Sequence, residues 1–464
     1  MTQALCRFIT CGSVDDGKST LIGRLLYDSK TLFVDQIHSL HTESKRYGTQ
    51  GENLDFALLV DGLSSEREQG ITIDVAYRFF STKKRKFIIA DTPGHEQYTR
   101  NMATGASTAD IAIILIDARK GVLTQTKRHS YIVSLLGIRH FFIAVNKMDL
   151  IDYDEERFRA ICGEYAQILK ELREDIVAHY IPISALKGEN IVSKSENLAW
   201  YRDKTLLEWL EDIELDSIPQ SEFVLPVQYV NRPHLNFRAF CGQIASGSVR
   251  VGDEVLVLPS MQKSRVAHII TSEITDPHTL TQDQTPQYAH EAYAPMSVSV
   301  CLQDERDVSR GDYIVSKNHT LSMGNTFRAM MIWLSETPLE LGTTYLLKIT
   351  HNLCNVRITE IVYKKDMESF TNVCADSLKL NDIAQCTLKL DKTLPLQCYK
   401  HSKILGAFII IDKYSNQTLG AGMIDSVSES IHRDSAPHRI YTDSEIALNA
   451  FICEHYPEWG CKKL

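Results

Sequence analysis

The chain has 464 residues, of which 44% are hydrophobic and 23% charged, and this length allows several domains with buried cores. Its formal net charge of −9 disfavours general nucleic-acid binding, which needs a surplus of lysine and arginine, although it allows a local basic patch. No apolar run approaches the ~18 residues that a membrane-spanning helix needs.

The cysteines and the N-terminal residues indicate a compartment. Eleven cysteines without a CxxC pair are typical of reduced thiols and not of a disulfide framework. The first residues, MTQALCRFITCG, lack the pattern of a signal peptide. We therefore expect a cytoplasmic protein that binds neither membrane nor nucleic acid.

Residues 1–217 alternate short apolar runs with longer segments whose apolar residues recur at helical spacing. Phe158, Ile161 and Tyr165, for example, would share one helix face. Alternating strands and helices predict an α/β domain with a mostly parallel sheet that is covered on both faces. We expect strands at 7–12, 86–91, 111–117, 141–147 and 180–185, and helices at 18–29, 124–138 and 155–172.

The texture changes after residue 217 to short β-rich runs separated by Gly, Asp and Pro. A second shift near residue 320 begins another β series. Both patterns are typical of small β-barrels, so we predict one barrel domain at 224–318 and another at 325–430. The remaining tail, 431–464, is compatible with packing on the second barrel.

The stretch GSVDDGKST follows the first predicted strand and opens a helix, and its spacing fits GxxxxGK[ST]. In such a loop, backbone N–H groups turn toward phosphate oxygens, the lysine reaches the terminal phosphates, and the next hydroxyl ligates Mg²⁺. The motif predicts a nucleotide phosphate site made of Gly12, Ser13, Val14, Asp15, Asp16, Gly17, Lys18, Ser19 and Thr20.

The stretch DTPGHEQ follows the strand that ends at Asp91. Asp91 is expected to hold Mg²⁺ through water, and the Gly94 N–H to meet the γ-phosphate. Thr72 would complete the magnesium coordination, although the same residues can also simply begin a strand. DxxG alone is a weak motif; its order between the other two motifs makes the interpretation persuasive.

His95 directly follows Gly94, where an imidazole could orient the water that attacks the γ-phosphate. The alternative is an exposed loop histidine. Val14 and Ile71 could form apolar walls beside His95, or pack as ordinary loop residues. Asp15 is unusual beside phosphates, because it adds negative charge: either it faces away, or it helps to bind a monovalent cation.

The stretch NKMD follows the strand at 141–147 and points to guanine. The Asp149 carboxylate can accept from both N1–H and the 2-amino group, a donor pair that adenine lacks. Asn146 can contact N7, and the stem of Lys147 can cover the ring. Backbone N–H groups of Ser184, Ala185 and Leu186 would bind O6. The alternative interpretation is a polar loop after a strand.

Together these motifs resemble the translation-factor superfamily of GTPases, in which a G domain precedes two β-barrels. The chain is most similar there to the GTPase subunits of bacterial ATP sulfurylases, through its residues 12–30, 59–82, 91–130 and 237–260. The resemblance implies a heteromeric enzyme that makes adenosine 5′-phosphosulfate and pyrophosphate from ATP and sulfate. It also implies GTP and Mg²⁺ as cofactors and a smaller partner subunit that carries out adenylyl transfer.

Other interpretations stay open at this stage, and one of them is a GTP-dependent scaffold without catalytic coupling. The same architecture serves translation factors that deliver aminoacyl-tRNA, and a net charge of −9 does not decide between the two functions. The polar segment 41–62 before Thr72 is interpreted as a solvated loop, although it could instead contact the partner. Asp117 receives no role beyond the edge of the sheet.

Overall fold

The computed structural model describes residues 4–29, 34–47, 54–60, 66, 72–215, 222–234, 237–271, 287–428, 448–451 and 455. Residues 1–428 form one compact unit, and residues 429–464 form a second. Most of the tail 431–464 lies outside the described residues.

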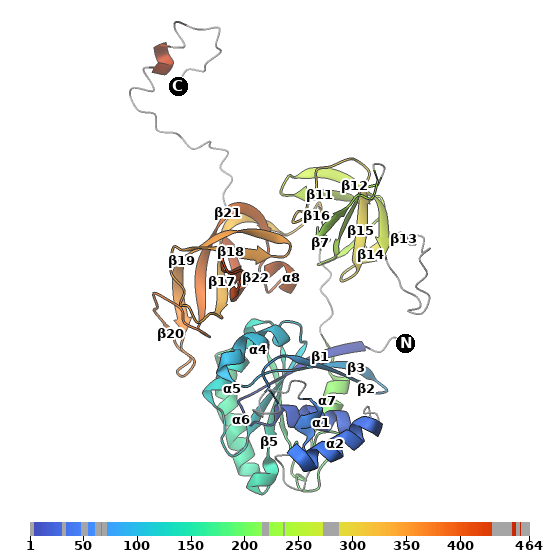
Figure 1. Ribbon diagram of the computed structural model, residues 1–464, viewed down its shortest axis with the longest axis vertical. Coiled ribbons are helices and arrows are strands. Elements are labelled where there is room, and N and C mark those ends of the chain that lie inside the picture. Colours follow the sequence, from blue (N-terminus) through green and yellow to red (C-terminus); the bar gives the residue numbers. More distant parts are fainter. Residues whose placement is uncertain are drawn as a thin grey trace. The chain divides into compact units, whose positions relative to one another are not determined.

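A six-stranded sheet forms the centre of the N-terminal domain (Figure 1). Its strand order is β2-β3-β1-β4-β5-β6, and only the edge strand β2 runs antiparallel to its neighbour. Strand β4 is buried along its whole length, as expected for a strand with helices on both faces. The strands are β1 (Ala4–Cys11), β2 (Ala76–Ser81), β3 (Arg85–Asp91), β4 (Ile111–Asp117), β5 (His140–Asn146) and β6 (Val177–Pro182).

Helices cover both faces of this sheet and create two apolar cores (Figure 1). One core contains residues of α4 (Thr99–Ala106), α5 (Thr124–Leu135) and α6 (Glu155–Lys170). The other contains residues of α1 (Lys18–Asp28) and α7 (Leu206–Asp212). Three short 3-10 helices connect elements near the carboxyl edge of the strands: η1 (Phe56–Leu59), η2 (Glu96–Tyr98) and η3 (Met148–Ile151).

The segment 41–62 is not simply a solvated loop, so that interpretation was wrong for the part that the structure describes. Helix α2 (Val34–Tyr47) includes its first residues, and η1 lies near its end. Ser44 and Phe56 are buried, and Phe56 packs edge-on against Tyr27 of α1. An apolar stripe on an otherwise polar segment is enough to hold it against the domain.

The first β domain is an antiparallel sheet with the order β7-β16-β11-β12-β15-β9-β8, to which β13 adds beside β12. Alternate residues of β12 point into an apolar core and out to the surface. Its strands are β7 (Val224–Pro226), β8 (Tyr229–Asn231), β9 (Ala239–Gln243), β10 (Ser248–Arg250), β11 (Glu254–Leu258), β12 (Gln262–Thr271), β13 (Gln287–Ala289), β14 (Glu291–Tyr293), β15 (Ser297–Leu302) and β16 (Tyr313–Ser316).

The second β domain is a closed barrel, because β19 pairs with β18 in addition to β21. The strands surround a separate core that includes Trp333 and Phe408. An α/β domain followed by two antiparallel β domains confirms the predicted fold class. The elements are β17 (Ser322–Trp333), β18 (Thr344–Ile349), β19 (Asn352–Lys365), β20 (Asn372–Val373), β21 (Ile383–Leu396), α8 (Lys403–Gly406), β22 (Ala407–Ile411) and β23 (Thr418–Ser428).

The closed barrel shares an apolar core with the helical face of the α/β domain. Met330 and Leu334 belong to the same buried cluster as residues of α4 and α5. The ring of Phe370 meets Tyr131 of α5 edge-on, with ring centroids 6.0 Å apart. The buried Tyr399 hydroxyl donates to the carbonyl oxygen of Leu136 at 3.1 Å. This interface connects the barrel directly to the helices behind the phosphate loop.

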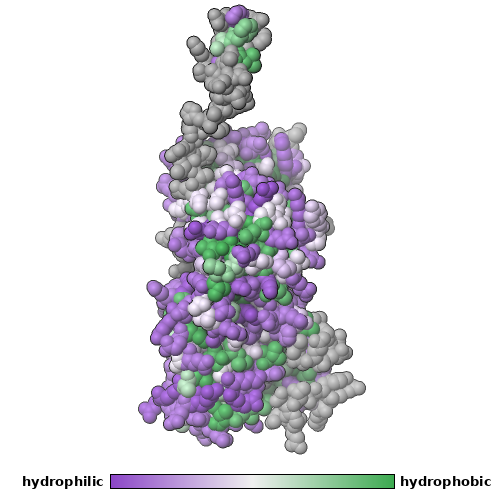
Figure 2. Space-filling view, turned by 90° about the vertical axis from the view of Figure 1, so that its left-hand side faces the viewer, coloured by the Kyte–Doolittle hydropathy of each residue, from purple (hydrophilic) through white to green (hydrophobic). Residues whose placement is uncertain are grey.

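Hydrophilic residues cover most of the face that Figure 2 shows, and hydrophobic residues form small separate patches there. None of the described helices combines the length and apolar character that a membrane crossing requires. The described cysteines are free thiols, as expected.

Candidate functional site

The phosphate loop joins the end of β1 to the start of α1. Gly17 has a φ of 92°, a backbone conformation that residues with a side chain rarely adopt. A Cβ there would lie 2.4 Å from Nδ2 of Asn146, so the loop can approach this side chain only with glycine. The buried Lys18 ammonium donates to the carbonyl oxygens of Ser13 at 2.7 Å and Gly12 at 3.3 Å.

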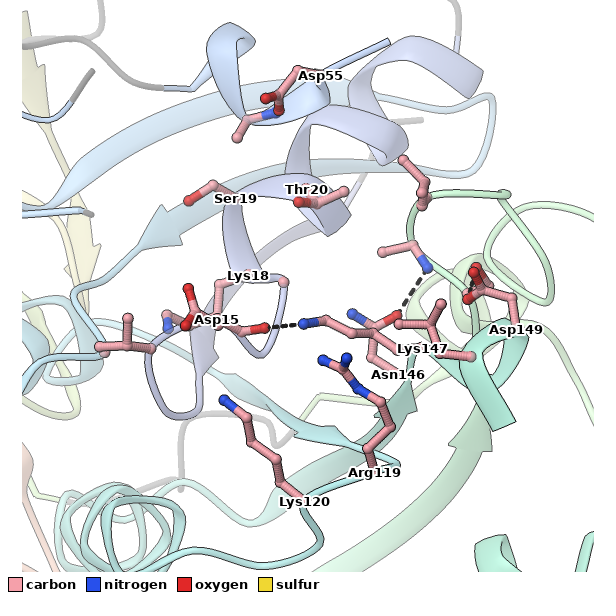
Figure 3. Close-up of a pocket in the computed structure, with 18 of the residues that line it drawn as sticks. Asp15, Lys18, Ser19, Thr20, Asp55, Arg119, Lys120, Asn146, Lys147 and Asp149 are labelled. Atoms are coloured by element: carbon pink, nitrogen blue, oxygen red, sulfur yellow. Dashed lines mark hydrogen bonds between the residues drawn. The ribbon is translucent and has the colours of Figure 1, made fainter. Parts of the chain in front are cut away.

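A pocket of about 500 Å³ opens beside this loop, and the predicted motifs meet in it (Figure 3). The predicted residues that line it are Val14, Asp15, Gly17, Lys18, Ser19, Thr20, Thr72, Gly94, Asn146, Lys147, Asp149, Ser184, Ala185 and Leu186. Gly12, Ser13, Asp16, Asp91 and His95 do not line it. Three motifs far apart in sequence therefore share one concave site, the arrangement expected for a nucleotide.

Oxygen donors suited to Mg²⁺ converge at the start of α1. The Ser19 hydroxyl lies 3.1 Å from Oδ2 of Asp91 and 3.2 Å from the Thr72 hydroxyl. Asp91 is fully buried, and burial raises the pKa of its carboxyl to about 6. Two hydroxyls beside a carboxylate form a hard-oxygen donor set, which fits this ion.

The residues of the NKMD stretch and of the loop at 184–186 form a hydrogen-bonded frame at the other end of the pocket. Asn146 donates from Nδ2 to the Asp16 carbonyl at 2.8 Å and accepts the Ala185 N–H at 2.9 Å. The Ser184 hydroxyl donates to Oδ1 of Asp149 at 2.7 Å (Figure 3). Asn146 thus ties the phosphate loop to the loop at 184–186, and Asp149 is held in a fixed orientation.

His95 lies just outside the pocket lining. Its half-buried imidazole caps η2, because Nδ1 accepts the Gln97 N–H at 3.3 Å. Gly94 beside it is tightly enclosed: a Cβ would lie 2.4 Å from Nζ of Lys18 and 2.8 Å from the backbone of Ser13. The loop therefore brings the Gly94 backbone against Lys18 and Ser13, with His95 as the next residue.

Asp117, Arg119 and Lys120 are site residues that the motifs did not identify. Asp117 is fully buried, and its carboxylate accepts three hydrogen bonds from Arg119, one from the backbone N–H at 3.0 Å and two from the guanidinium at 3.0 and 2.6 Å. It also forms an ion pair with Lys147 at 3.1 Å. Burial alone would raise the pKa of Asp117, but hydrogen bonds from Arg119 and Lys147 hold it well below its usual range. Arg119 and Lys120 line the pocket (Figure 3).

A sequence signal for these residues exists. The stretch DARKG follows a fully buried strand, and the carboxyl ends of parallel strands meet at one edge of the sheet. Asp55, which also lines the pocket, gave no such signal because it lies in the segment interpreted as a loop.

The two aspartates of the phosphate loop differ in environment. Asp15 is exposed at the pocket, and its backbone carbonyl accepts a hydrogen bond from Lys147 (Figure 3). Asp16 is buried, and its Oδ2 accepts the Ser13 N–H at 2.5 Å, while burial raises the pKa of its carboxyl. Val14 lines the pocket; Ile71 lies outside the described residues.

A buried histidine supports the loop from behind. His129 of α5 is 0% exposed, and its Nδ1 accepts the Gly12 N–H at 3.3 Å. Burial, together with the charges of Lys18 and Arg128, lowers the pKa of His129 to about 3. The histidine is therefore neutral in the folded chain at every pH at which the protein is expected to work.

This neutral histidine predicts a loss of stability in acid. Between pH 6.5 and about 3 the unfolded chain binds a proton at His129 that the folded chain does not bind. The free energy of unfolding therefore decreases as the pH falls through this window, and the full contribution of the neutral histidine is present above pH 6.5. The slope is at most about 1.4 kcal/mol per pH unit. His129→Asn keeps an acceptor without the titration and should flatten the dependence. Urea unfolding at pH 7.5, 6.5 and 5.5 measures it; equal slopes for both chains would contradict the prediction.

Comparisons with known proteins match nearly the whole chain. Residues 3–216 match the family described as the Elongation factor Tu GTP binding domain, and residues 326–425 match the GTP-eEF1A C-terminal domain-like family. Three similar proteins are each named sulfate adenylyltransferase subunit 1. The one from Sulfurovum sp. (strain NBC37-1) is 52% identical, over 99% of this chain and 95% of that protein. Those from Saccharophagus degradans and Aliivibrio salmonicida are 49% and 50% identical, over 100% of this chain and 95% and 94% of theirs.

Proposed function

The chain belongs to the family of sulfate adenylyltransferase subunit 1, and we propose that it is the GTPase subunit of a sulfate adenylyltransferase. In this proposal GTP hydrolysis drives the formation of adenosine 5′-phosphosulfate and pyrophosphate from ATP and sulfate. The observation that carries it is the single pocket in which the phosphate loop, Gly94 and Asp149 meet, within a chain about half identical to these relatives.

Different residues of the pocket bind the phosphates and the base of the nucleotide. Backbone N–H groups of the phosphate loop and the Lys18 ammonium bind the phosphates, and the α1 N-terminus adds partial positive charge. Asp149 accepts from the guanine, while Lys147 covers the ring. Asp117 fixes Lys147 and Arg119 by charge-assisted hydrogen bonds, so that both cations stay at the pocket wall.

Magnesium fits the donors at the start of α1. Ser19 and Thr72 would ligate it directly, and Asp91 would hold it through water. When bound, the ion supplies positive charge to the phosphate oxygens. The chain's own contribution is to orient Thr72 and Gly94 toward the phosphates and to hold His95 next to Gly94. We assign to His95 the orientation of the attacking water.

We propose three functional domains, 1–217, 224–318 and 325–430, that respond to the nucleotide state. Loss of the γ-phosphate releases the segments around Thr72 and Gly94, and the β domains or the partner sense the change. The partner is a smaller subunit that carries out adenylyl transfer, and the single GxxxxGK[ST] loop of this sequence agrees with that division. A cytoplasmic location agrees with the free thiols.

The rival function is delivery of aminoacyl-tRNA by a translation factor with the same architecture. Full-length identity of about 50% to proteins named sulfate adenylyltransferase subunit 1 favours the metabolic function. Retention of labelled aminoacyl-tRNA by the chain in the presence of GTP would favour the rival.

The test mixes the full chain with a candidate small subunit and follows two products in one tube. We expect pyrophosphate release from ATP and sulfate to depend on GTP, and GTP hydrolysis to respond to ATP plus sulfate, because coupling between sites is reciprocal for binding. Pyrophosphate formation that ignores GTP, or GTP turnover indifferent to ATP and sulfate, would overturn the coupling.

A further inference from the structure

One side chain of the closed barrel reaches the loop that carries His95. Asn381, just before β21, donates from Nδ2 to the carbonyl oxygen of Glu96 at 2.9 Å. Glu96 is the residue after His95 and the first residue of η2. Arg100, in the helix that continues η2, donates to the carbonyl oxygen of Leu334 at 2.7 Å. The barrel therefore forms two hydrogen bonds with the segment that follows His95 in the chain.

Asn381 is a polar side chain in surroundings that are mostly apolar. Asn381 is only 4% exposed, in an interface made mostly of apolar side chains. Its Oδ1 is buried without a hydrogen-bond partner among the described residues, and such a group destabilises the folded chain. The bond from Nδ2 to the Glu96 carbonyl connects this buried amide to the α/β domain.

The carbonyl of Glu96 also accepts from the Thr99 hydroxyl at 2.7 Å, within the same segment. The Glu96 side chain pairs with Arg128 of α5 at 2.7 Å. These bonds belong to the α/β domain and fix the shape of η2. Asn381 adds the bond that fixes η2 relative to the barrel.

We propose that Asn381 is a positioning residue for GTP hydrolysis: its amide fixes η2 and thereby the position of His95 next to Gly94, which lines the pocket. The inference rests on the proposed role of His95. It makes the barrel part of the hydrolytic geometry, so a partner that shifts the barrel would change turnover without touching the nucleotide.

The backbone conformation of Asn381 offers an alternative reason for an asparagine at this position. Substitutions can distinguish this reason from the proposed positioning role. Asn381 has a φ of 68°, and asparagine tolerates this conformation better than most residues. Asn381→Gly keeps the turn and removes the amide. Asn381→Asp keeps the size of the side chain but cannot donate to the carbonyl. Tyr399→Phe is the matched control, because it removes one hydrogen bond from the same interface at the C-terminal end of α5 and not at η2.

The experiment measures GTP turnover and affinity of the full chain without ATP or sulfate, together with its thermal unfolding midpoint. We expect kcat to fall roughly 3- to 10-fold in Asn381→Gly and Asn381→Asp, the effect of losing one hydrogen bond. KM and GTP affinity should stay unchanged, and Tyr399→Phe should behave as the parent chain. In a His95→Ala background, Asn381→Gly should cause no further loss.

Some results would contradict the role of Asn381, and another would contradict the role of His95. Parental kcat in both Asn381 variants, an equal fall in Tyr399→Phe, or an undiminished loss in the His95→Ala background would overturn the positioning role. Parental turnover in His95→Ala itself would remove His95 from the mechanism, and this inference with it. GTP turnover and GTP affinity are both measured without ATP or sulfate, so neither depends on adenylyl transfer. A failure of the proposed coupling to sulfate would appear in the separate pyrophosphate assay.

Discussion

Asp149→Asn is expected to weaken GTP binding by roughly 10²- to 10⁴-fold, because a carboxylate that accepts from two guanine donors is replaced by an amide with only one acceptor. The amide NH₂ would then face a donor of the base. Xanthine has a carbonyl oxygen in place of the 2-amino group and matches the amide. The variant should therefore prefer xanthosine triphosphate.

Equilibrium titration of the parent and variant chains with both nucleotides measures this exchange. Ser184, whose hydroxyl holds Oδ1 of Asp149, provides a matched control. Ser184→Ala should weaken both nucleotides by a similar, smaller factor, since it loosens Asp149 without changing its chemistry. GTP affinity within threefold of the parent in Asp149→Asn would remove Asp149 from base recognition.

His95→Ala is expected to bind GTP normally and to hydrolyse it at least about 10²-fold more slowly, the typical effect of losing a group that orients or deprotonates a nucleophile. Binding should survive because His95 does not line the pocket. Single-turnover hydrolysis and nucleotide affinity, measured on the same preparation, separate the two effects.

His95→Gln is the control for the capping role that His95 also has at η2. A glutamine can orient water, so this variant should retain much more activity than His95→Ala. Equal turnover in the parent and in His95→Ala would show that the imidazole takes no part in hydrolysis. Equal losses in both variants would instead indicate that the shape of η2 matters more than the side chain.

The sequence allowed most of the α/β domain to be predicted, because its motifs sit at fixed points between strands and helices. The strand 111–117 was predicted with its observed bounds, since its first six residues are apolar and stand between Asp110 and Asp117. Helix α2 was missed because its buried stripe is narrow and its other residues are polar. The closure of the second barrel by β18 and β19 depends on strand pairing, which spacing alone does not specify.

The candidate site divides in the same way. Residues whose chemistry follows from motif spacing, such as Lys18 and Asp149, could be named from the sequence. For Asp117 the stretch DARKG indicates only a place at the same edge of the sheet, because its role comes from contacts with Arg119 and Lys147 that the folded chain brings together. Asn381 lies 285 residues from Glu96, and no local pattern links the two.

The core shared by the closed barrel and the α/β domain affects how the chain can be divided for study. Tyr131 and Leu136 are almost fully buried in the cluster that also contains barrel residues such as Met330. A fragment that stopped at residue 217 would lay this apolar surface open to water, at about 25 cal/mol per Å² of exposed apolar area. Such a fragment should aggregate or bind dyes that report exposed apolar surface, whereas the intact chain should unfold these two modules in one cooperative transition.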